Sequence, residues 1–189
     1  MKQRAGSKVT EAEFQDLEKL VSQEPTPDRA AAKLAKLLKV QRTEVALLRV
    51  DRGLLKFLYP AELRTAGAIP VSSNAVAART VTTRTSLLSN TFVRIKHVSL
   101  FESVRLGNGS EGNEVVDPTP IQKLMSVQVQ NDQGIVLGVI QISRKGLDAS
   151  AAGPDFTNEE LHHLERSAGI IARMPFMTGE STTSATAGS

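Results

Sequence analysis

The spacing of hydrophobic residues near the N-terminus predicts two helices. The first begins at a capping-box pattern, in which Thr10 and Glu13 satisfy each other's exposed N–H groups. Its apolar positions recur at helical spacing: Phe14, Leu17, Leu20 and Val21. The second helix is expected to follow Thr26, with Pro27 at its first position. Its predicted buried face consists of Ala30, Leu34, Leu37 and Leu38.

A hairpin of two strands is predicted next, because the apolar residues no longer recur at helical spacing. Residues 44–50 form a nearly continuous apolar run that is typical of a buried strand. Residues 51–53 form a tight turn, and residues 54–59 run back as the partner strand. A short helix is predicted over residues 74–79. It should stop early, because the β-branched run at residues 80–85 disfavours a helix.

The clearest strand signal lies in the C-terminal half. Residues 124–130 alternate apolar and polar side chains, and residues 131–134 form a turn. Residues 136–143 then run back, so the two strands are expected to pair as an antiparallel hairpin. Gly138 lies inside the second strand, which indicates that another part of the chain approaches closely there.

The last helix is predicted to begin at a second capping box, formed by Thr157 and Glu160. Phe156 and Leu161 fit a hydrophobic staple, which fixes the angle at which the chain enters the helix. The apolar stripe of this helix consists of Leu161, Leu164, Ala168, Ile171 and Ala172. The helix should end near Met174, since the following proline cannot continue it. We expect this helix to dock on the sheet.

These elements divide the chain into four parts. Residues 1–9 are polar and residues 177–189 are rich in Ser and Thr, so both ends are expected to be disordered. Residues 10–25 form the N-terminal helix, and residues 26–176 form one folded domain. Within the domain, a short strand is predicted before a long connection at residues 91–119. A connection of that length is usually functional or disordered.

The amino-acid composition of the chain argues against several classes of function. The 189 residues contain no cysteine, which excludes disulfides, Cys-based metal sites and thiol catalysis. The net charge of +3 is scattered and aromatic residues make up only 4% of the chain, so nucleic-acid binding is not expected. No stretch approaches the ~18 apolar residues of a membrane span, and no signal peptide is visible. A cytoplasmic protein without membrane contact is therefore expected.

The C-terminal half of the sequence resembles a GAF domain. The stretch "IQKLMSVQVQNDQGIVLGVIQISRKG", followed by "DFTNEELHHLERSAGIIA", is similar to the closing hairpin and helix of that family. The earlier stretch "IPVSSNAVAARTVTTRTSLLSN" is similar to the family's small helix and third strand. The resemblance covers residues 27–174.

The resemblance implies an α+β fold of the GAF/PAS type. Its central antiparallel sheet has the strand order 2-1-5-4-3, with the N- and C-terminal helices on one face and a pocket on the other. Residues 73–79 and 91–119 would roof that pocket. GAF domains bind cyclic nucleotides, tetrapyrroles or other small molecules, or dimerise, and they usually pass a signal to an attached effector.

The predicted ligand contacts lie in and before the long connection, where hydrogen-bond donors are concentrated. The candidates are Asn90, Arg94, Lys96, His97 and Arg105. Basic groups of this kind could neutralise a phosphate, but the Asn-Lys…Phe…Asp-Glu pattern of cyclic-GMP-binding GAF domains is absent. The alternative is that these residues merely solvate the loop. The cofactor is therefore left unknown.

Neither catalysis nor metal binding is predicted. No Gly-x-Ser-x-Gly, phosphate-loop or His-Glu-x-x-His motif occurs, and the free-methionine-sulfoxide reductases that resemble GAF domains need cysteines. His162 and His163 are adjacent on a helix and should point to different faces, while His97 stands alone as a conceivable haem ligand. The chain is therefore predicted not to be an enzyme.

Two functions fit these observations. The first is a GAF-type regulatory or sensory module that binds a small molecule or mediates dimerisation in signal transduction. It would act through an unidentified signalling protein, because no effector domain is visible. The alternative is a scaffold or protein-interaction domain whose pocket is filled by its own side chains. A cavity of some hundreds of Å3 with convergent polar groups would favour the first.

The first helix is also the predicted dimerisation element. The second helix and the last helix are expected to cover one face of the sheet between them. The stripe that contains Leu17 is then expected to stay exposed and to pair across a two-fold axis in a homodimer. The alternative is that this stripe folds back on its own domain.

Overall fold

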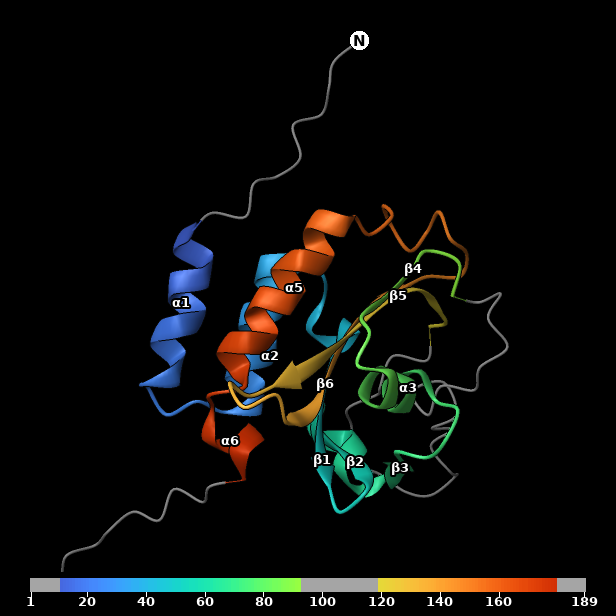
Figure 1. Ribbon diagram of the computed structural model, residues 1–189. Helices are drawn as coiled ribbons and strands as arrows, with labels where there is room; N and C mark the ends of the chain where they lie inside the picture. The colour runs from blue at the N-terminus through green and yellow to red at the C-terminus, as the bar shows by residue number, and fades with distance from the viewer. Residues whose placement is uncertain (1–10, 93–118, 180–189) are drawn as a thin grey trace, which may run out of the picture.

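The computed structural model describes residues 11–92 and 119–179, which form helices and one antiparallel sheet (Figure 1). The helices are α1 (Glu11–Val21), α2 (Pro27–Leu38), α3 (Val76–Thr83), α5 (Asn158–Ile171) and α6 (Pro175–Thr178), with short 3-10 turns η1 (Arg42–Glu44) and η2 (Ala61–Thr65). The strands are β1 (Val45–Asp51), β2 (Leu54–Tyr59), β3 (Ala68–Pro70), β4 (Leu87–Ser89), β5 (Ile121–Gln130) and β6 (Val136–Lys145). None of these helices is long and apolar enough to cross a membrane.

Within the described residues, the strands follow the order β3-β2-β1-β6-β5-β4. β5 and β6 pair antiparallel, with Met125 opposite Ile142, which confirms the predicted hairpin. The predicted five-strand order differs from this one because it lacks β3, which adds a sixth strand beside β2. β3 has three residues and ends at Pro70, so it is too short to show a hydrophobic period. The α+β fold class is confirmed.

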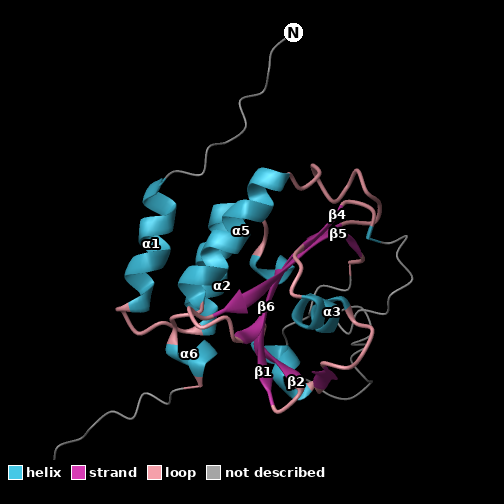
Figure 2. Cartoon of the chain, viewed as in Figure 1, coloured by secondary structure: helices cyan, strands magenta, loops and turns pink. Residues whose placement is uncertain are grey.

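The sheet lies between helices α2 and α5 on one side and α3 on the other (Figure 2), and buried apolar clusters fill both sides. Helices α2 and α5 pack on one face, where Leu34, Leu164 and Ile142 belong to one buried cluster, and α1 packs on these two helices. Helix α3 covers part of the other face, where Ala78 packs with Val139. This division follows from the two-residue period of the strands, since neighbouring residues such as Val139 and Ile140 point to opposite faces.

Helix α1 packs on its own domain. Phe14, Leu17 and Leu20 are at most 2% exposed and belong to the same core as α2 and α5. The prediction that this stripe is left exposed is therefore wrong, and the fold-back alternative is observed. The reason is that α1 packs on α2 and α5, which lie between it and the sheet, so its stripe is covered by these two helices. The exposed stripe was the sequence evidence for a homodimer. The homodimer therefore stays a prediction, now without that evidence.

Two ion pairs fasten α1 to α5 and to the residues that follow it. Arg166 donates hydrogen bonds of 3.0 and 2.5 Å to the carboxylate of Glu11, and Arg173 donates one of 2.5 Å to Glu18. The hydrogen bond from Arg166 is the main cause that lowers the pKa of Glu11 below its usual value. Both pairs are exposed to solvent, which screens them, so the buried apolar stripe contributes most of the docking.

Helix α3 is longer than the sequence predicts. It was expected over residues 74–79, but it continues to Thr83. The threonine hydroxyls bond back into the helix: Thr80 Oγ1 donates to the carbonyl of Val76 at 2.9 Å, and Thr83 Oγ1 donates to that of Arg79 at 2.8 Å. The buried face of α3 adds packing energy, and together these contacts outweigh a weak helix propensity.

Gly138 lies where β1, β6 and α6 approach one another, as its place inside a strand predicts. A Cβ atom at this position would overlap the carbonyl oxygen of Leu48 and lie 2.6 Å from Cε of Met177. Met177 is 2% exposed, so α6 closes this end of the core. The sequence prediction placed Met177 in a disordered tail, and that part is wrong. Residues 180–189 lie outside the described part of the chain.

Candidate functional site

A row of uncharged polar side chains lies on the sheet face beneath α3. Alternate residues of β5 point into the core under α5, so Ser126 and Gln128 point to the α3 face. Gln141 of β6 lies opposite Ser126 and donates a hydrogen bond to its hydroxyl at 3.4 Å. The hydroxyl oxygens of Ser126 and Thr80 are 2.8 Å apart in a buried contact. The polar row therefore continues from the sheet to α3.

Gln128 carries an acceptor without a partner. Its Nε2 donates to Gln130 Oε1 at 3.2 Å, but within the described structure its own Oε1 is buried and accepts no hydrogen bond. An unpaired buried oxygen of this kind costs about 1–3 kcal/mol, which a donor placed nearby would recover. Gln128 lies on β5 two residues beyond Ser126, the partner of Leu87 at the start of β4.

A cavity of about 310 Å3 lies between α3 and β4. Its lining consists of Val76, Arg79, Thr80, Thr83, Thr85, Ser86 and Leu87. The volume is at the lower end of the ~300–1,000 Å3 that small-molecule sites occupy. Of the seven described lining residues, four carry hydroxyl groups and Arg79 carries a charged guanidinium, so the walls are partly apolar and partly polar.

The lining hydroxyls act toward the cavity as acceptors. Thr83 donates to the carbonyl of Arg79 at 2.8 Å, Thr85 donates to the carbonyl of Thr83 at 3.1 Å, and Ser86 donates to Glu165 Oε1 at 2.6 Å. Each hydroxyl hydrogen is thus used within the protein, while oxygen lone pairs stay available. The hydroxyl side of the site therefore suits a molecule that brings N–H or O–H groups, while Arg79 adds a positive charge to the lining.

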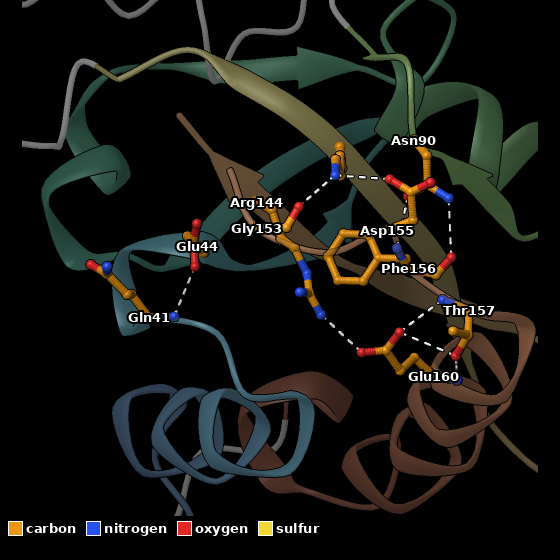
Figure 3. Close-up of polar contacts among 10 residues, drawn as sticks. Gln41, Glu44, Asn90, Arg144, Gly153, Asp155, Phe156, Thr157 and Glu160 are labelled. Carbon is orange, nitrogen blue, oxygen red and sulfur yellow. Dashed lines mark hydrogen bonds and ion pairs between the residues drawn. The ribbon is translucent and has the colours of Figure 1, made fainter. Parts of the chain in front are cut away.

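The structure describes only one of the five predicted ligand residues. The others lie outside the described residues: Arg94, Lys96, His97 and Arg105. Asn90 is described, and its side-chain amide is bonded to the backbone. Its Nδ2 donates to the carbonyl of Phe156 at 3.0 Å, and its Oδ1 accepts from the N–H of Phe156 at 2.8 Å (Figure 3). Asn90 therefore fastens the end of β4 to the start of α5, a structural role that the prediction missed.

This contact has a measurable consequence. We expect Asn90→Ala to lower the free energy of unfolding by about 1–3 kcal/mol, because both backbone groups of Phe156 lose their partner. Asn74→Ala, the same change at an exposed position before α3, should alter it by less than about 0.5 kcal/mol. Urea denaturation of the two variants measures the difference. Equal stabilities would show that Asn90 does not hold Phe156 in solution.

The start of α5 is held by further polar contacts (Figure 3). Thr157 Oγ1 accepts from the N–H of Glu160 at 3.1 Å, and Glu160 Oε2 accepts from the N–H of Thr157 at 2.7 Å, which confirms the capping box. Arg144 of β6 donates to the other carboxylate oxygen of Glu160 at 2.9 Å. Its guanidinium carbon lies 4.5 Å from the centroid of the Phe156 ring. The helix start is thus bound to the sheet.

Lys123 of β5 fastens the loop before α5. Its side chain is only 5% exposed, and its Nζ donates to the carbonyl of Gly153 at 2.6 Å and pairs with Asp155 at 2.8 Å. A buried ammonium group needs such partners, because burial removes its hydration. Lys123, like Arg144, therefore positions α5 rather than facing the cavity.

The sequence prediction centred the site on residues 90–105 and missed the hydroxyls at residues 80–86. That run was interpreted only as a helix terminator, because β-branched residues have a low helix propensity. The missed signal was a concentration of threonine and serine directly after the predicted roof helix. Side chains of that kind can satisfy one another and still present oxygen atoms to a ligand.

In the parts of the chain that the structure describes, no three His, Cys, Asp or Glu side chains gather in a way that could hold a metal ion. His162 and His163 have different surroundings, as predicted. His162 is exposed, whereas the ring of His163 meets Phe14 of α1 edge-on at 5.6 Å between centroids.

The chain is similar to known proteins in its three-dimensional structure. No protein-family model and no curated protein sequence matches the chain. The GAF domain of an Acinetobacter phosphoenolpyruvate-protein phosphotransferase aligns with a TM-score of 0.58 at 12% identity, over 92% of this chain and 99% of that one. A GAF domain/HD domain protein from Geobacter sulfurreducens aligns with a TM-score of 0.51 at 14% identity, over 86% of this chain and 97% of that one.

Enzymes are among the similar structures. The reduced free methionine-R-sulfoxide reductase of Staphylococcus aureus aligns with a TM-score of 0.56 at 16% identity, over 92% of this chain and 98% of that one. This finding contradicts the prediction that the chain is not an enzyme. The prediction relied on the absence of motifs that belong to other folds and on the absence of cysteine, and neither excludes other chemistry on this fold. What the likenesses have in common is the architecture: the chain has the GAF-domain fold.

Proposed function

We propose that this chain is a regulatory module that binds a small molecule in the cavity between α3 and β4. The observation that carries the proposal is the cavity of about 310 Å3, bordered by hydroxyl oxygens whose hydrogens are donated within the protein. The GAF fold, whose members include sensory and regulatory domains, supports the regulatory part.

The lining limits the ligand class. Val76 and Leu87 offer apolar contact, while Thr83, Thr85 and Ser86 offer acceptors. A compact, largely apolar molecule with N–H or O–H groups would match both features.

The alternative function is a scaffold whose pocket is filled by its own side chains. The open volume between α3 and β4 favours ligand binding over this alternative. The homodimer, the unidentified signalling partner and the cytoplasmic location stay predictions.

A thermal-shift screen against nucleotides, haem and amino acids tests the ligand site. A bound ligand at a hundredfold excess over Kd adds about 2.7 kcal/mol to stability, which raises the Tm of a domain of this size by about 5–10 °C. Thr83→Trp places a large ring at the cavity and should abolish the shift. Thr82→Trp is the matched control, because Thr82 is exposed on the same helix and does not line the cavity.

Comparison of the two variants shows whether a compound binds in the cavity or elsewhere. A compound that stabilises the wild type and Thr82→Trp, but not Thr83→Trp, binds in the cavity. An equal shift in both variants would place binding elsewhere and contradict the proposed site. If no compound raised the Tm of the wild type, the scaffold function would be favoured.

A further inference from the structure

Ser86 belongs to the cavity wall and also contacts α5. Its hydroxyl lines the cavity between α3 and β4 and donates a 2.6 Å hydrogen bond to Glu165 Oε1 in the middle of α5. The acceptor is charged, and hydrogen bonds to ionised groups are stronger than those between neutral groups. One side chain therefore connects the cavity directly with α5.

The other end of β4 is also bound to α5. Asn90 follows the strand and holds both backbone groups of Phe156, the residue before the capping box. β4 thus contacts α5 on both sides of its three residues, through Ser86 before the strand and Asn90 after it.

β4 itself is weakly anchored in the core. It is an edge strand of three residues, and all three are only partly buried. In contrast, α5 contributes Leu164, Ala168 and Ile171 to the main core, and its start is fixed by Arg144 and Thr157. Elements with few buried apolar contacts open and shift at the lowest free-energy cost. A molecule in the cavity would therefore displace or fix β4 more readily than α5.

We propose that β4 reports occupancy of the cavity to α5 through the hydrogen bond between Ser86 and Glu165. This inference rests on the proposed function, because it takes the cavity to be the ligand site. An occupant excludes water from the Ser86 hydroxyl and donates to its oxygen, which makes the hydroxyl a better donor to Glu165. The hydrogen bond is then held, and α5 opens less often.

Glu165 is placed to pass this effect further. The next residue along α5, Arg166, carries the bidentate hydrogen bonds to Glu11 of α1 and lies 4.0 Å from the Phe14 ring centroid. Adjacent residues of α5 therefore contact β4 and α1. The N-terminal helix is the next element to which a change in α5 would be transmitted.

The absence of cysteine from the sequence provides a test without a known ligand. A Thr83→Cys variant has its single thiol at the cavity, and labelling that thiol with 2-hydroxyethyl methanethiosulfonate tethers an occupant that carries an O–H donor. Hydrogen exchange measured by mass spectrometry follows peptides from α3, β4, α5 and α2. Labelled Thr82→Cys, on the exposed side of α3, is the matched control.

We expect the label at position 83 to slow exchange in α5 by about fivefold, at the lower end of typical coupling between two sites. Exchange in α2 should not change, which separates coupling from a general gain in stability. Adding Ser86→Ala should abolish the effect on α5, whereas Ser86→Thr, which keeps the hydroxyl, should retain it. Glu165→Ala should abolish it as well.

The possible failures are distinguishable. Slower exchange in α3 and β4 without any change in α5 would overturn the coupling and leave the ligand site intact. Slowing in α5 that persisted in the Ser86→Ala background would overturn the role of this hydrogen bond. If the label changed exchange in neither α3 nor β4, the cavity would not accept an occupant, and both the proposed function and this inference would be wrong.

Discussion

Replacing Gly138 with alanine is expected to lower the free energy of unfolding by about 3 kcal/mol or more, at or beyond the upper end of ordinary overpacking. The added methyl group would overlap the carbonyl oxygen of Leu48, and backbone in a paired strand cannot move aside as a side chain can. It would also push on Met177, whose Cε lies 2.6 Å from the new atom. Urea denaturation, with folding monitored by circular dichroism, measures the loss.

Gly169→Ala is the control for this substitution. Gly169 lies on the exposed side of α5, and a Cβ atom there would meet nothing within 4 Å. Because alanine is the better helix former, this variant should gain about 0.5–1 kcal/mol. The same chemical change should therefore have opposite signs at the two sites. A Gly138→Ala variant as stable as the wild type would show that β1 and α6 do not approach this strand as described.

Leu17→Ala is expected to lower the free energy of unfolding by about 2–5 kcal/mol, the range for removing a fully buried leucine side chain. Leu17 is 0% exposed between α2 and α5, so its loss leaves a cavity in the main core. Gln15→Ala, two residues away on the exposed side of α1, should change stability by less than about 0.5 kcal/mol. Urea denaturation compares the two.

The same variant decides between the two interpretations of α1. If the stripe packs within one chain, the destabilisation by Leu17→Ala does not depend on protein concentration. If the stripe instead formed a dimer interface in solution, the Tm of the wild type would rise with concentration, and that dependence would disappear in the variant. Sedimentation of the full chain gives the oligomeric state independently.

Local signals predicted the elements whose ends are encoded by short-range chemistry. The capping box of Thr157 and Glu160 and the hairpin of β5 and β6 are both present. In each case the deciding interactions join residues a few positions apart, so the pattern in the sequence contains nearly all the necessary information. The sequence also predicted a close approach at Gly138, because a glycine inside a strand is a local signal. It could not identify the two groups that approach, the carbonyl of Leu48 and the side chain of Met177.

Predictions failed where distant packing determined the outcome. The end of α3 depends on burial of its apolar face against the sheet, which compensates for the β-branched residues after Arg79. The fate of the stripe on α1 depends on the space between α2 and α5, which no local pattern reports. Asn90 stays a predicted ligand residue, but its hydrogen bonds to Phe156, a residue 66 positions away, could not be predicted from a local pattern. The cavity depends in the same way on the meeting of α3 and β4.

The two edges of the sheet have a consequence for how copies of this protein meet. β3 and β4 are the edge strands and have three residues each, against ten in β5 and ten in β6. At about 3.4 Å per residue, each edge strand presents only roughly 10 Å of backbone to a neighbouring molecule. Short edges are poor templates for strand addition, which is the usual route from a native sheet to fibrous aggregates. Concentrated folded protein is therefore expected to resist this form of aggregation.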